Sequence, residues 1–365
     1  MKKVVVGMSG GVDSSVAAFL LKESGYDVKG VTMQTWEDNE PHGMAILRDA
    51  KRVAEVLGIS HEVIDFKDEF KKEVVDYFVG EYLCGRTPNP CTVCNRFVKW
   101  QALLKYCENV GADYVGTGHY AHVCRIDSRY TLRKSTKSSK DQTYALYNLS
   151  QEQLAKTLMP IGEYTKEEVR QIAKRENIPV ADKPDSQEIC FIPDDDYAGF
   201  ISRRIESNNK EISGKKKSEN DADDKSILKP GNFVTKTGEI LGVHKGITHY
   251  TIGQRRGLGL AMGHHVFVTE IRPDTNEVVV GESEELFSTE LRCNKINFMG
   301  MADLIEPRKV IAKVRYAHQG QEAVIEKISA DEIRCTFLTP VRAITPGQAV
   351  VFYEGDYVLG GGTIL

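Results

Sequence analysis

The first half of the chain alternates short β-branched runs with amphipathic stretches. Three consecutive valines at residues 4–6 predict a buried strand, and the stretch from Val16 places apolar side chains on one face of a helix. The same alternation predicts strands at 28–33, 61–64 and 114–116, and helices at about 45–57, 70–78 and 95–109. Such an order is typical of a parallel sheet covered by helices on both faces. Residues that follow the strands, among them Ser9, Met33 and Gly118, are then expected at one edge of the sheet.

The pattern changes after residue 119. Two capping boxes, Ser150–Gln153 and Thr165–Glu168, indicate a more helical stretch, and a loop rich in proline and aspartate is expected at 178–193. Residues 208–226 are polar and lack periodicity, which predicts a disordered surface insertion.

From Leu228 the chain consists of short alternating runs separated by turn signals, including 310–316 and 323–328, which predict a small barrel or sandwich. We therefore expect an α/β protein with three domains. These are a Rossmann-like catalytic domain with a parallel sheet at 1–198, a small central β-rich domain at 199–285 and a C-terminal β-barrel at 286–365.

Composition limits the class of protein. The chain has 365 residues, 41% hydrophobic and 27% charged, and no apolar run has the length of a membrane span. The N-terminus leads directly into the first strand, so no signal peptide is expected. Eight irregularly spaced cysteines do not resemble a secreted disulfide framework, which favours a cytoplasmic protein with no membrane partner. With a net charge of −4, binding of nucleic acid would need local basic patches.

The turn after the first strand reads Ser9-Gly-Gly-Val-Asp-Ser-Ser15. A glycine-rich turn that opens a helix directs backbone N–H groups and the positive end of the helix dipole at one point, where a phosphate group binds. Asp13 could hold a magnesium ion against the phosphates. The simpler interpretation is an ordinary helix N-cap. The segment lacks the Lys-Ser/Thr ending of a Walker A loop and resembles the loop of ATP pyrophosphatases, enzymes that split ATP into AMP and pyrophosphate.

A second segment, Thr87-Pro-Asn-Pro-Cys-Thr-Val-Cys-Asn95, carries two thiols. Its prolines predict a rigid loop, and Cys94 is expected near the start of the next helix, where the helix dipole favours the thiolate. A zinc half-site would need a second pair of ligands, and a thioredoxin-like disulfide lacks its following pattern. Simple burial is the third alternative. It suits five cysteines better than Cys94 and Cys190: Cys84, Cys107, Cys124, Cys293 and Cys335.

Seven motifs occur in order along nearly the whole chain: SGGVDSS, TPNPCTVCN, GTGHYA, KDQTY, DSQEICFI, HYTIGQRRGLG and VRYAHQG. Together they resemble the bacterial tRNA-specific 2-thiouridylases. The resemblance implies ATP-dependent 2-thiolation of the wobble uridine of Lys, Glu and Gln tRNAs. The C2 oxygen is adenylated, and sulfur comes from a cysteine persulfide. It implies ATP and magnesium as cofactors, and as partners these tRNAs and a sulfur-donor protein or cysteine desulfurase.

The resemblance also assigns roles to residues. Cys190 carries the persulfide, Cys94 is the second catalytic cysteine, and Asp13 acts in the phosphate loop. Nucleotide binding falls to Gly7, Met8, Ser9, Gly10, Gly11, Val12, Asp13, Ser14, Met33 and Gly118. The target base lies against Asn89, Pro90 and Cys91. Other tRNA contacts are expected from His119, Lys140, Asp141, Gln142, Arg315, Tyr316 and Gln348.

One position departs from the family pattern, which has Asp where this chain has Cys91. The extra thiol leaves room for an iron–sulfur site on Cys91, Cys94 and Cys190, ranked behind the persulfide mechanism. Two other functions stay open on the residues alone. One is a different ATP-pyrophosphatase-loop enzyme, and the other is a nucleotide-sensing RNA-binding module without turnover. Cys190→Ser would distinguish the enzyme from the module. In the enzyme, ATP-dependent thiolation would vanish while RNA binding persists. The module would have no thiolation to lose.

Overall fold

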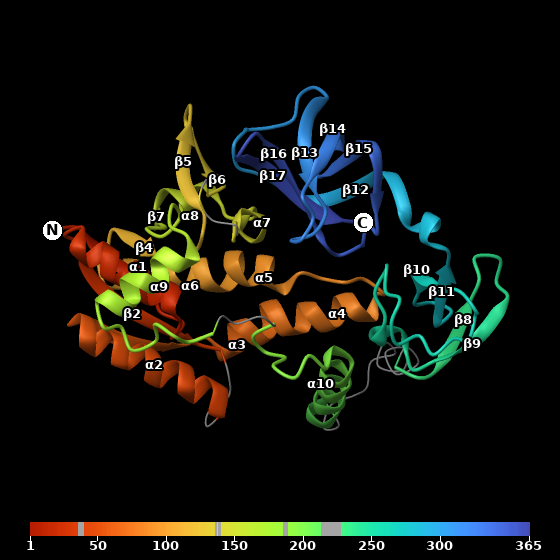
Figure 1. The fold of residues 1–365 in the computed structure, drawn as a ribbon, viewed down its shortest axis with the longest axis horizontal. Helices are drawn as coiled ribbons and strands as arrows, with labels where there is room; N and C mark the ends of the chain where they lie inside the picture. The colour runs from red at the N-terminus through yellow and green to blue at the C-terminus, as the bar shows by residue number, and fades with distance from the viewer. Residues whose placement is uncertain (36–39, 136, 138–139, 185–188, 213–227) are drawn as a thin grey trace.

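The computed structural model describes all residues except 36–39, 136, 138–139, 185–188 and 213–227. Figure 1 shows a parallel sheet with helices at the N-terminal end of the molecule, a small sheet at the far end, and a barrel above the junction between them. No helix within the described ranges is long and apolar enough to cross a membrane.

The first sheet has five parallel strands in the order β3-β2-β1-β4-β7. Their bounds are β1 (Lys3–Gly7), β2 (Asp27–Gln34), β3 (Ser60–Asp65), β4 (Tyr114–Gly116) and β7 (Thr157–Leu158). The predicted strands are confirmed, and only the two-residue edge strand β7 is missing from the prediction. Strand β1 lies between β2 and β4, so Ser9, Met33 and Gly118 come from neighbouring strand ends, as expected.

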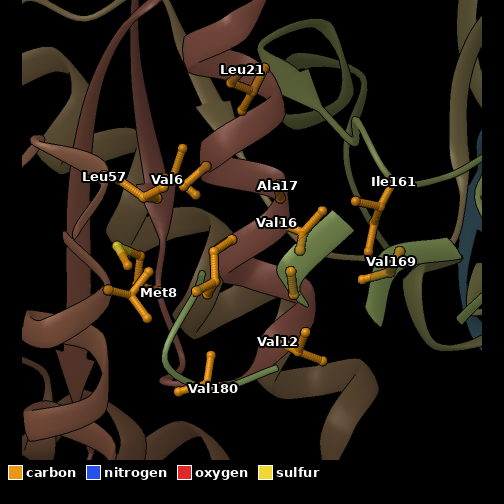
Figure 2. Close-up of a cluster of buried hydrophobic side chains, with 14 of the residues drawn as sticks. Val6, Met8, Val12, Val16, Ala17, Leu21, Leu57, Ile161, Val169 and Val180 are labelled. Carbon is orange, nitrogen blue, oxygen red and sulfur yellow. The ribbon is translucent and has the colours of Figure 1, made fainter. Parts of the chain in front are cut away.

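Helix α1 (Val12–Glu23) packs on this sheet with nearly all of its apolar side chains buried. Figure 2 shows Val16, Ala17 and Leu21 of α1 packed between two groups. On one side are Val6 and Met8 of the strand side, and on the other is helix α9 (Lys166–Arg175). Since α1 is covered on both sides, the position of its first turn is fixed by the core.

The other three predicted helices are each longer than expected, as continuous helical stretches at 41–57, 67–83 and 90–109 that comprise seven elements. They are α2 (Pro41–Leu57), α3 (Lys67–Phe70), η1 (Lys71–Asp76), α4 (Tyr77–Leu83), α5 (Pro90–Val93), η2 (Cys94–Trp100) and α6 (Gln101–Asn109). The helix expected at 95–109 begins at Pro90, so Cys94 lies inside it. Both η1 and η2 are π-helical, a local widening that is frequent at functional sites.

Residues 117–165 hold less helix than expected. The two capping boxes are confirmed at α8 (Gln151–Ala155) and α9, and α7 (Thr143–Leu146) is a single turn. Before them, β5 (His122–Ile126) and β6 (Arg129–Arg133) form an antiparallel hairpin that the sequence analysis missed. Tyr357 of the barrel pairs with Arg133, so the hairpin extends the barrel sheet.

Helix α10 (Tyr197–Ile212) packs against α4 through Ile201 and Ile205. Residues 208–212 are therefore helical, and the expected disorder is wrong there, while 213–226 lie outside the described residues. The central sheet has the order β10-β11-β8-β9. Its elements are β8 (Gly231–Val234), β9 (Ile240–His244), η3 (Ile247–His249), β10 (Phe267–Arg272), β11 (Glu277–Gly281) and η4 (Ser283–Leu286).

The C-terminal strands close into a barrel, because β12 pairs with both β15 and β17. The strands are β12 (Phe287–Phe298), β13 (Arg308–Lys313), β14 (Gln321–Ser329), β15 (Glu332–Arg342), β16 (Ala349–Glu354) and β17 (Tyr357–Ile364). The strand predicted at 310–316 ends at Lys313, so Arg315 and Tyr316 lie in the following turn. The α/β fold with a parallel sheet, a central β-rich part and a barrel is confirmed.

Candidate functional site

The glycine-rich turn joins β1 to α1 at the carboxyl edge of the parallel sheet. Gly10 has a φ of +65°, and a Cβ there would lie 2.6 Å from the Ile46 carbonyl oxygen, so this position requires glycine. Gly11 is the N-cap of α1 and supplies no side-chain cap. The first N–H groups of α1 therefore face the turn without a capping side chain, as a phosphate site requires.

Serine hydroxyls fix the shape of the turn. The Ser14 hydroxyl accepts from the Ser9 N–H at 3.2 Å and donates to the Gly11 carbonyl oxygen at 3.2 Å, and the Ser15 hydroxyl donates to the same carbonyl at 2.8 Å. The Lys183 ammonium donates to the Gly10 carbonyl oxygen at 3.0 Å and forms an ion pair with Asp49 at 2.7 Å. The turn is thus held from two neighbouring segments, and Val12 at its end is part of the packed core.

Asp13 lies in the first turn of α1 and is fully engaged within the protein. Lys166 at the start of α9 donates to both of its carboxylate oxygens at 2.8 Å, and the Tyr120 hydroxyl donates to Oδ1 at 2.7 Å. A carboxylate paired in this way does not fit the expected role of magnesium ligand, and we assign no step to a metal on Asp13. Its position still places it beside the phosphate turn.

Gly118 connects the turn to the neighbouring strand. A Cβ at Gly118 would lie 2.5 Å from the Asp13 carbonyl carbon and the Ser14 nitrogen, so only glycine allows this approach. The next residue, His119, shares a hydrogen bond with the Thr117 hydroxyl, and its ring packs in a tilted arrangement on Trp100 of η2, with ring centroids 5.3 Å apart. Burial and the nearby Lys99 lower the pKa of His119 to about 3, so its ring is neutral at pH 7. It therefore cannot contact RNA phosphate as a cation.

The two expected catalytic thiols come from distant segments that meet beside η2. Cys94 packs with Phe70, Val74 and Val98, and Phe191, which follows Cys190, packs against the same cluster. Cys94 and Cys190 also interact electrostatically with each other and with Lys99. The sequence prediction that the two thiols lie near each other agrees with this arrangement.

Cys94 lies four residues after Pro90, where the helical stretch begins, and not at the helix start itself. Cys94 is buried within a continuous helix, and this burial raises the pKa of its thiol to about 12 against an opposing effect of Lys99. Desolvation also raises the pKa of Cys190, although that residue is exposed at the surface. Cys94 is therefore a protected thiol in this structure, and its ionisation depends on nearby positive charge.

Lys99 is the cation that the sequence analysis overlooked. It interacts with Cys91, Cys94 and Cys190, and although burial acts to lower its pKa, these thiols outweigh that effect and raise it. In a π-helix, residues i and i+5 are hydrogen-bonding neighbours, so the register of η2 brings Lys99 one turn from Cys94. In an α-helix the two side chains would point to different faces, and sequence patterns give no signal of a π-helix.

The burial of the other cysteines differs in part from the prediction. Cys107, Cys293 and Cys335 are buried as expected, but Cys84 is exposed and Cys124 is half-buried. All eight cysteines are free thiols. In the part of the chain that the structure describes, no group of three or more Cys, His, Asp or Glu is arranged to hold a metal ion.

The residues expected against the target base form the start of the cysteine helix. Asn89 is the N-cap of α5, and its side-chain oxygen accepts from the Cys91 N–H at 3.1 Å. Pro90 occupies the first helical position, which suits a residue without an N–H. Cys91 is exposed, while Cys94 one turn further is buried. This places Cys91 on the outer side of the site.

The expected tRNA contacts lie in two places. Gln142 is bound to the Tyr120 backbone in both directions, at 2.8 and 3.0 Å, and the Asp141 carboxylate accepts from the N–H and the hydroxyl of Thr143. Tyr316 of the barrel is half-exposed and packs on Tyr144 at 6.2 Å, next to Lys140 and Asp141. Four expected contacts therefore share one surface between α7 and the barrel: Lys140, Asp141, Gln142 and Tyr316.

Arg315 and Gln348 lie elsewhere, at the junction of the three domains. Together with Thr87, Thr251 and Arg342 they line a cavity of about 340 Å³. Arg315 donates to the Arg342 carbonyl oxygen at 2.9 Å, which keeps its guanidinium at the cavity wall. The cavity is distinct from the phosphate turn.

Comparison with known proteins supports the identity of each domain. The tRNA methyl transferase HUP domain matches residues 2–194, the tRNA methyl transferase PRC-barrel domain matches 224–282, and the aminomethyltransferase beta-barrel domain matches 288–364. The tRNA-specific 2-thiouridylase MnmA of Lachnoclostridium phytofermentans is 56% identical over the whole of both chains. The protein of the same name from Carboxydothermus hydrogenoformans is 50% identical over 100% of this chain and 97% of its own length. The chain therefore belongs to the family of tRNA-specific 2-thiouridylases.

Proposed function

We propose that this protein is an ATP-dependent tRNA-uridine 2-sulfurtransferase that thiolates C2 of the wobble uridine in Lys, Glu and Gln tRNAs. The observation that carries the proposal is the meeting of Cys94 and Cys190 beside Lys99, with His119 linking this cluster to the phosphate turn. Family membership supports the same activity. The arrangement combines a nucleotide site with paired thiols, as a sulfur transfer driven by ATP requires.

The first step activates a poor leaving group. The uracil C2 oxygen attacks the α-phosphate of ATP, so that pyrophosphate leaves and the base carries AMP on that oxygen. The uncapped N–H groups of α1 and the Ser9 hydroxyl stabilise the phosphate charge, and Ser14 holds the turn in shape. The base must leave the anticodon stack to reach this site, as in other enzymes that modify bases.

The second step transfers sulfur. The terminal sulfur of a Cys190 persulfide adds to C2 and AMP leaves, which gives a base joined to Cys190 through a disulfide. The Cys94 thiolate then attacks the Cys190 sulfur and releases 2-thiouridine, and a Cys94–Cys190 disulfide remains. The two thiols supply the two electrons that reduce the transferred sulfur. A persulfide donor, such as a sulfur-carrier protein or cysteine desulfurase, and a thiol reductant complete the cycle.

The test is mass spectrometry of tRNA after incubation with ATP, magnesium, a persulfide donor and the protein. We expect a gain of one sulfur in place of oxygen at the wobble uridine, with one AMP formed per sulfur. Cys190→Ser should abolish thiolation and leave tRNA affinity unchanged, whereas the matched Cys124→Ser should keep activity. Thiolation that survives in Cys190→Ser would contradict the persulfide assignment.

Pairing of the thiols can be tested without turnover. Mild oxidation of the free protein should join Cys94 to Cys190, because these two thiols share one cluster. Peptide mapping would identify the pair. A Cys91–Cys94 disulfide in its place would support a local redox or metal role for that motif.

A further inference from the structure

The segment before the catalytic helix is held by both β domains. Gly85, with a φ of +68°, lies so close to the central domain that a Cβ would come within 2.8 Å of Pro273. Thr87 follows, and its hydroxyl donates to that of Thr251 at 3.4 Å. The route into the Cys91–Cys94 motif therefore runs along the domain junction.

The strongest contacts come from a turn of the barrel at residues 346–348. The Thr87 N–H donates to the Pro346 carbonyl oxygen at 2.9 Å. The Gln348 side-chain amide donates to the Thr87 carbonyl oxygen at 2.9 Å and to that of Pro88 at 3.4 Å. Gly347 has a φ of +90°, and a Cβ there would lie 3.1 Å from Thr87 backbone atoms, so the approach depends on glycine.

This turn is itself anchored in the barrel. The Gly347 N–H donates to the Ile364 carbonyl oxygen at 2.9 Å, and the Ile364 N–H donates to the Gln348 carbonyl oxygen at 2.8 Å. The turn thus belongs to the rigid end of β17. Its hydrogen bonds to the Thr87 backbone connect that rigid element directly to the cysteine segment.

A shift of the Thr87 backbone would be passed on to Cys91 and Cys94, because few backbone torsion angles lie between them to absorb it. Only Pro88, Asn89 and Pro90 separate it from Cys91, and the two prolines fix two of the three φ angles. Asn89 is bonded to the helix at both its side chain and its carbonyl, through Cys91 and Thr92. The segment therefore acts as a short, stiff connection between barrel and catalytic helix.

We propose that Gln348 is a positioning residue that holds the 87–94 segment against the barrel and so sets where Cys91 and Cys94 stand relative to the target base. The catalytic part of this proposal rests on the proposed function, whereas the structural part does not. The family resemblance implies that Gln348 contacts RNA. Its side-chain amide, however, already donates to the Thr87 and Pro88 carbonyl oxygens. The barrel then has a role in the catalytic step in addition to any RNA binding.

The test compares Gln348→Met with Gln321→Met in the full-length protein. Methionine keeps the length of the side chain and removes the donor, and Gln321 is a half-buried barrel residue whose side-chain oxygen accepts from the Thr339 hydroxyl. For Gln348→Met we expect amide hydrogen exchange at Thr87 and Cys91 to rise about tenfold, as for the loss of one hydrogen bond. Exchange at Val350 in the barrel core should not change in either variant.

The kinetic readout separates positioning from binding. Gln348→Met should lower kcat for thiolation about tenfold and leave KM for tRNA within about twofold, because the lost contact orients the thiols and not the RNA. A higher KM with unchanged kcat and unchanged exchange at Thr87 would overturn the proposal in favour of an RNA contact.

Two further outcomes are defined. If the wild-type protein does not thiolate tRNA, the proposed function fails, and hydrogen exchange alone still decides whether Gln348 positions the segment. Gln348→Glu provides a second variant of the same shape, in which a carboxylate faces two carbonyl oxygens. We expect it to raise exchange at Thr87 more than methionine does, and equal exchange to wild type in both variants would overturn the proposal.

Discussion

Lys166 and Asp13 form a two-point ion pair that joins the first turn of α9 to the first turn of α1. Both distances are 2.8 Å, and the side chains are only 9% and 32% exposed. Helix α9 thereby helps to fix the phosphate turn, and the carboxylate is balanced by an ammonium group of the same chain. A charge left without its partner here would be poorly solvated.

Asp13→Ala should therefore destabilise the fold as well as stop AMP formation. We expect the free energy of unfolding to fall by about 2–3 kcal/mol, somewhat less than for a fully buried pair, because Asp13 is partly exposed. Asp13→Asn should cost less, since its amide oxygen still accepts from Lys166. Urea unfolding measures the effect, and Lys174→Met, which breaks a surface pair with Asp182, should change it little. Identical unfolding of Asp13→Ala and wild type would contradict the role of the pair.

Alkylation rates should report the environment of each thiol. With iodoacetamide at pH 7–10, the exposed Cys84 and Cys91 should react first, and Cys94 should be slow. Because the pKa of Cys94 is about 12, its thiolate fraction should rise about tenfold per pH unit over this range.

Lys99→Met should slow the alkylation of Cys94 further, by about tenfold for each unit by which the pKa of Cys94 rises. Lys99→Arg should preserve the wild-type rate. Lys105→Met, on the exposed face of α6, is the matched control. If Cys94 reacts as fast as Cys91 at pH 7, the buried environment described here is wrong.

His119 should make the protein sensitive to acid. Its pKa is about 3 when folded and about 6.5 when unfolded, so the unfolded chain binds the proton more readily between these values. The stability is fully present above about pH 6.5 and is lost as pH falls toward 3, by at most about 1.4 kcal/mol per pH unit. His119→Gln should flatten this dependence in urea unfolding between pH 7 and 4.5.

Arg315 should contribute one phosphate contact if tRNA reaches the domain junction. Arg315→Ala should then weaken tRNA binding and reduce the slope of log K against log salt by about 0.7–0.9, with ATP affinity unchanged. Arg308→Ala, which removes a surface pair with Glu354, is the control. Gel shifts at several salt concentrations measure the slope. An unchanged slope for Arg315→Ala would show that this side chain serves only the cavity wall and its bond to Arg342.

The parallel sheet could be predicted because buried strands such as Val4–Val6 carry an unbroken apolar signal. The phosphate turn could be predicted because glycines such as Gly10 and Gly118 mark close backbone approaches. The β5–β6 hairpin was missed because its partner strand, β17, lies more than 200 residues away in the chain. Lys99 and Lys166 were missed for a related reason. Their partners depend on a π-helical register and on the packing of α9, neither of which leaves a pattern in the sequence.

The hairpin has a consequence for how the protein folds. Arg129 donates to the carbonyl oxygens of Phe298 and Met299, and Thr131 donates to that of Val358, so backbone groups of the barrel are satisfied by the N-terminal half. A barrel made without residues 122–133 would leave the start of β17, at Tyr357 and Val358, without these partners, although β12 and β16 still pair with the rest of the strand. The N-terminal half emerges first from the ribosome, and its hairpin must wait for the last strand to be synthesised. Residues 129–131 therefore gain these partners only after the barrel strands have been made.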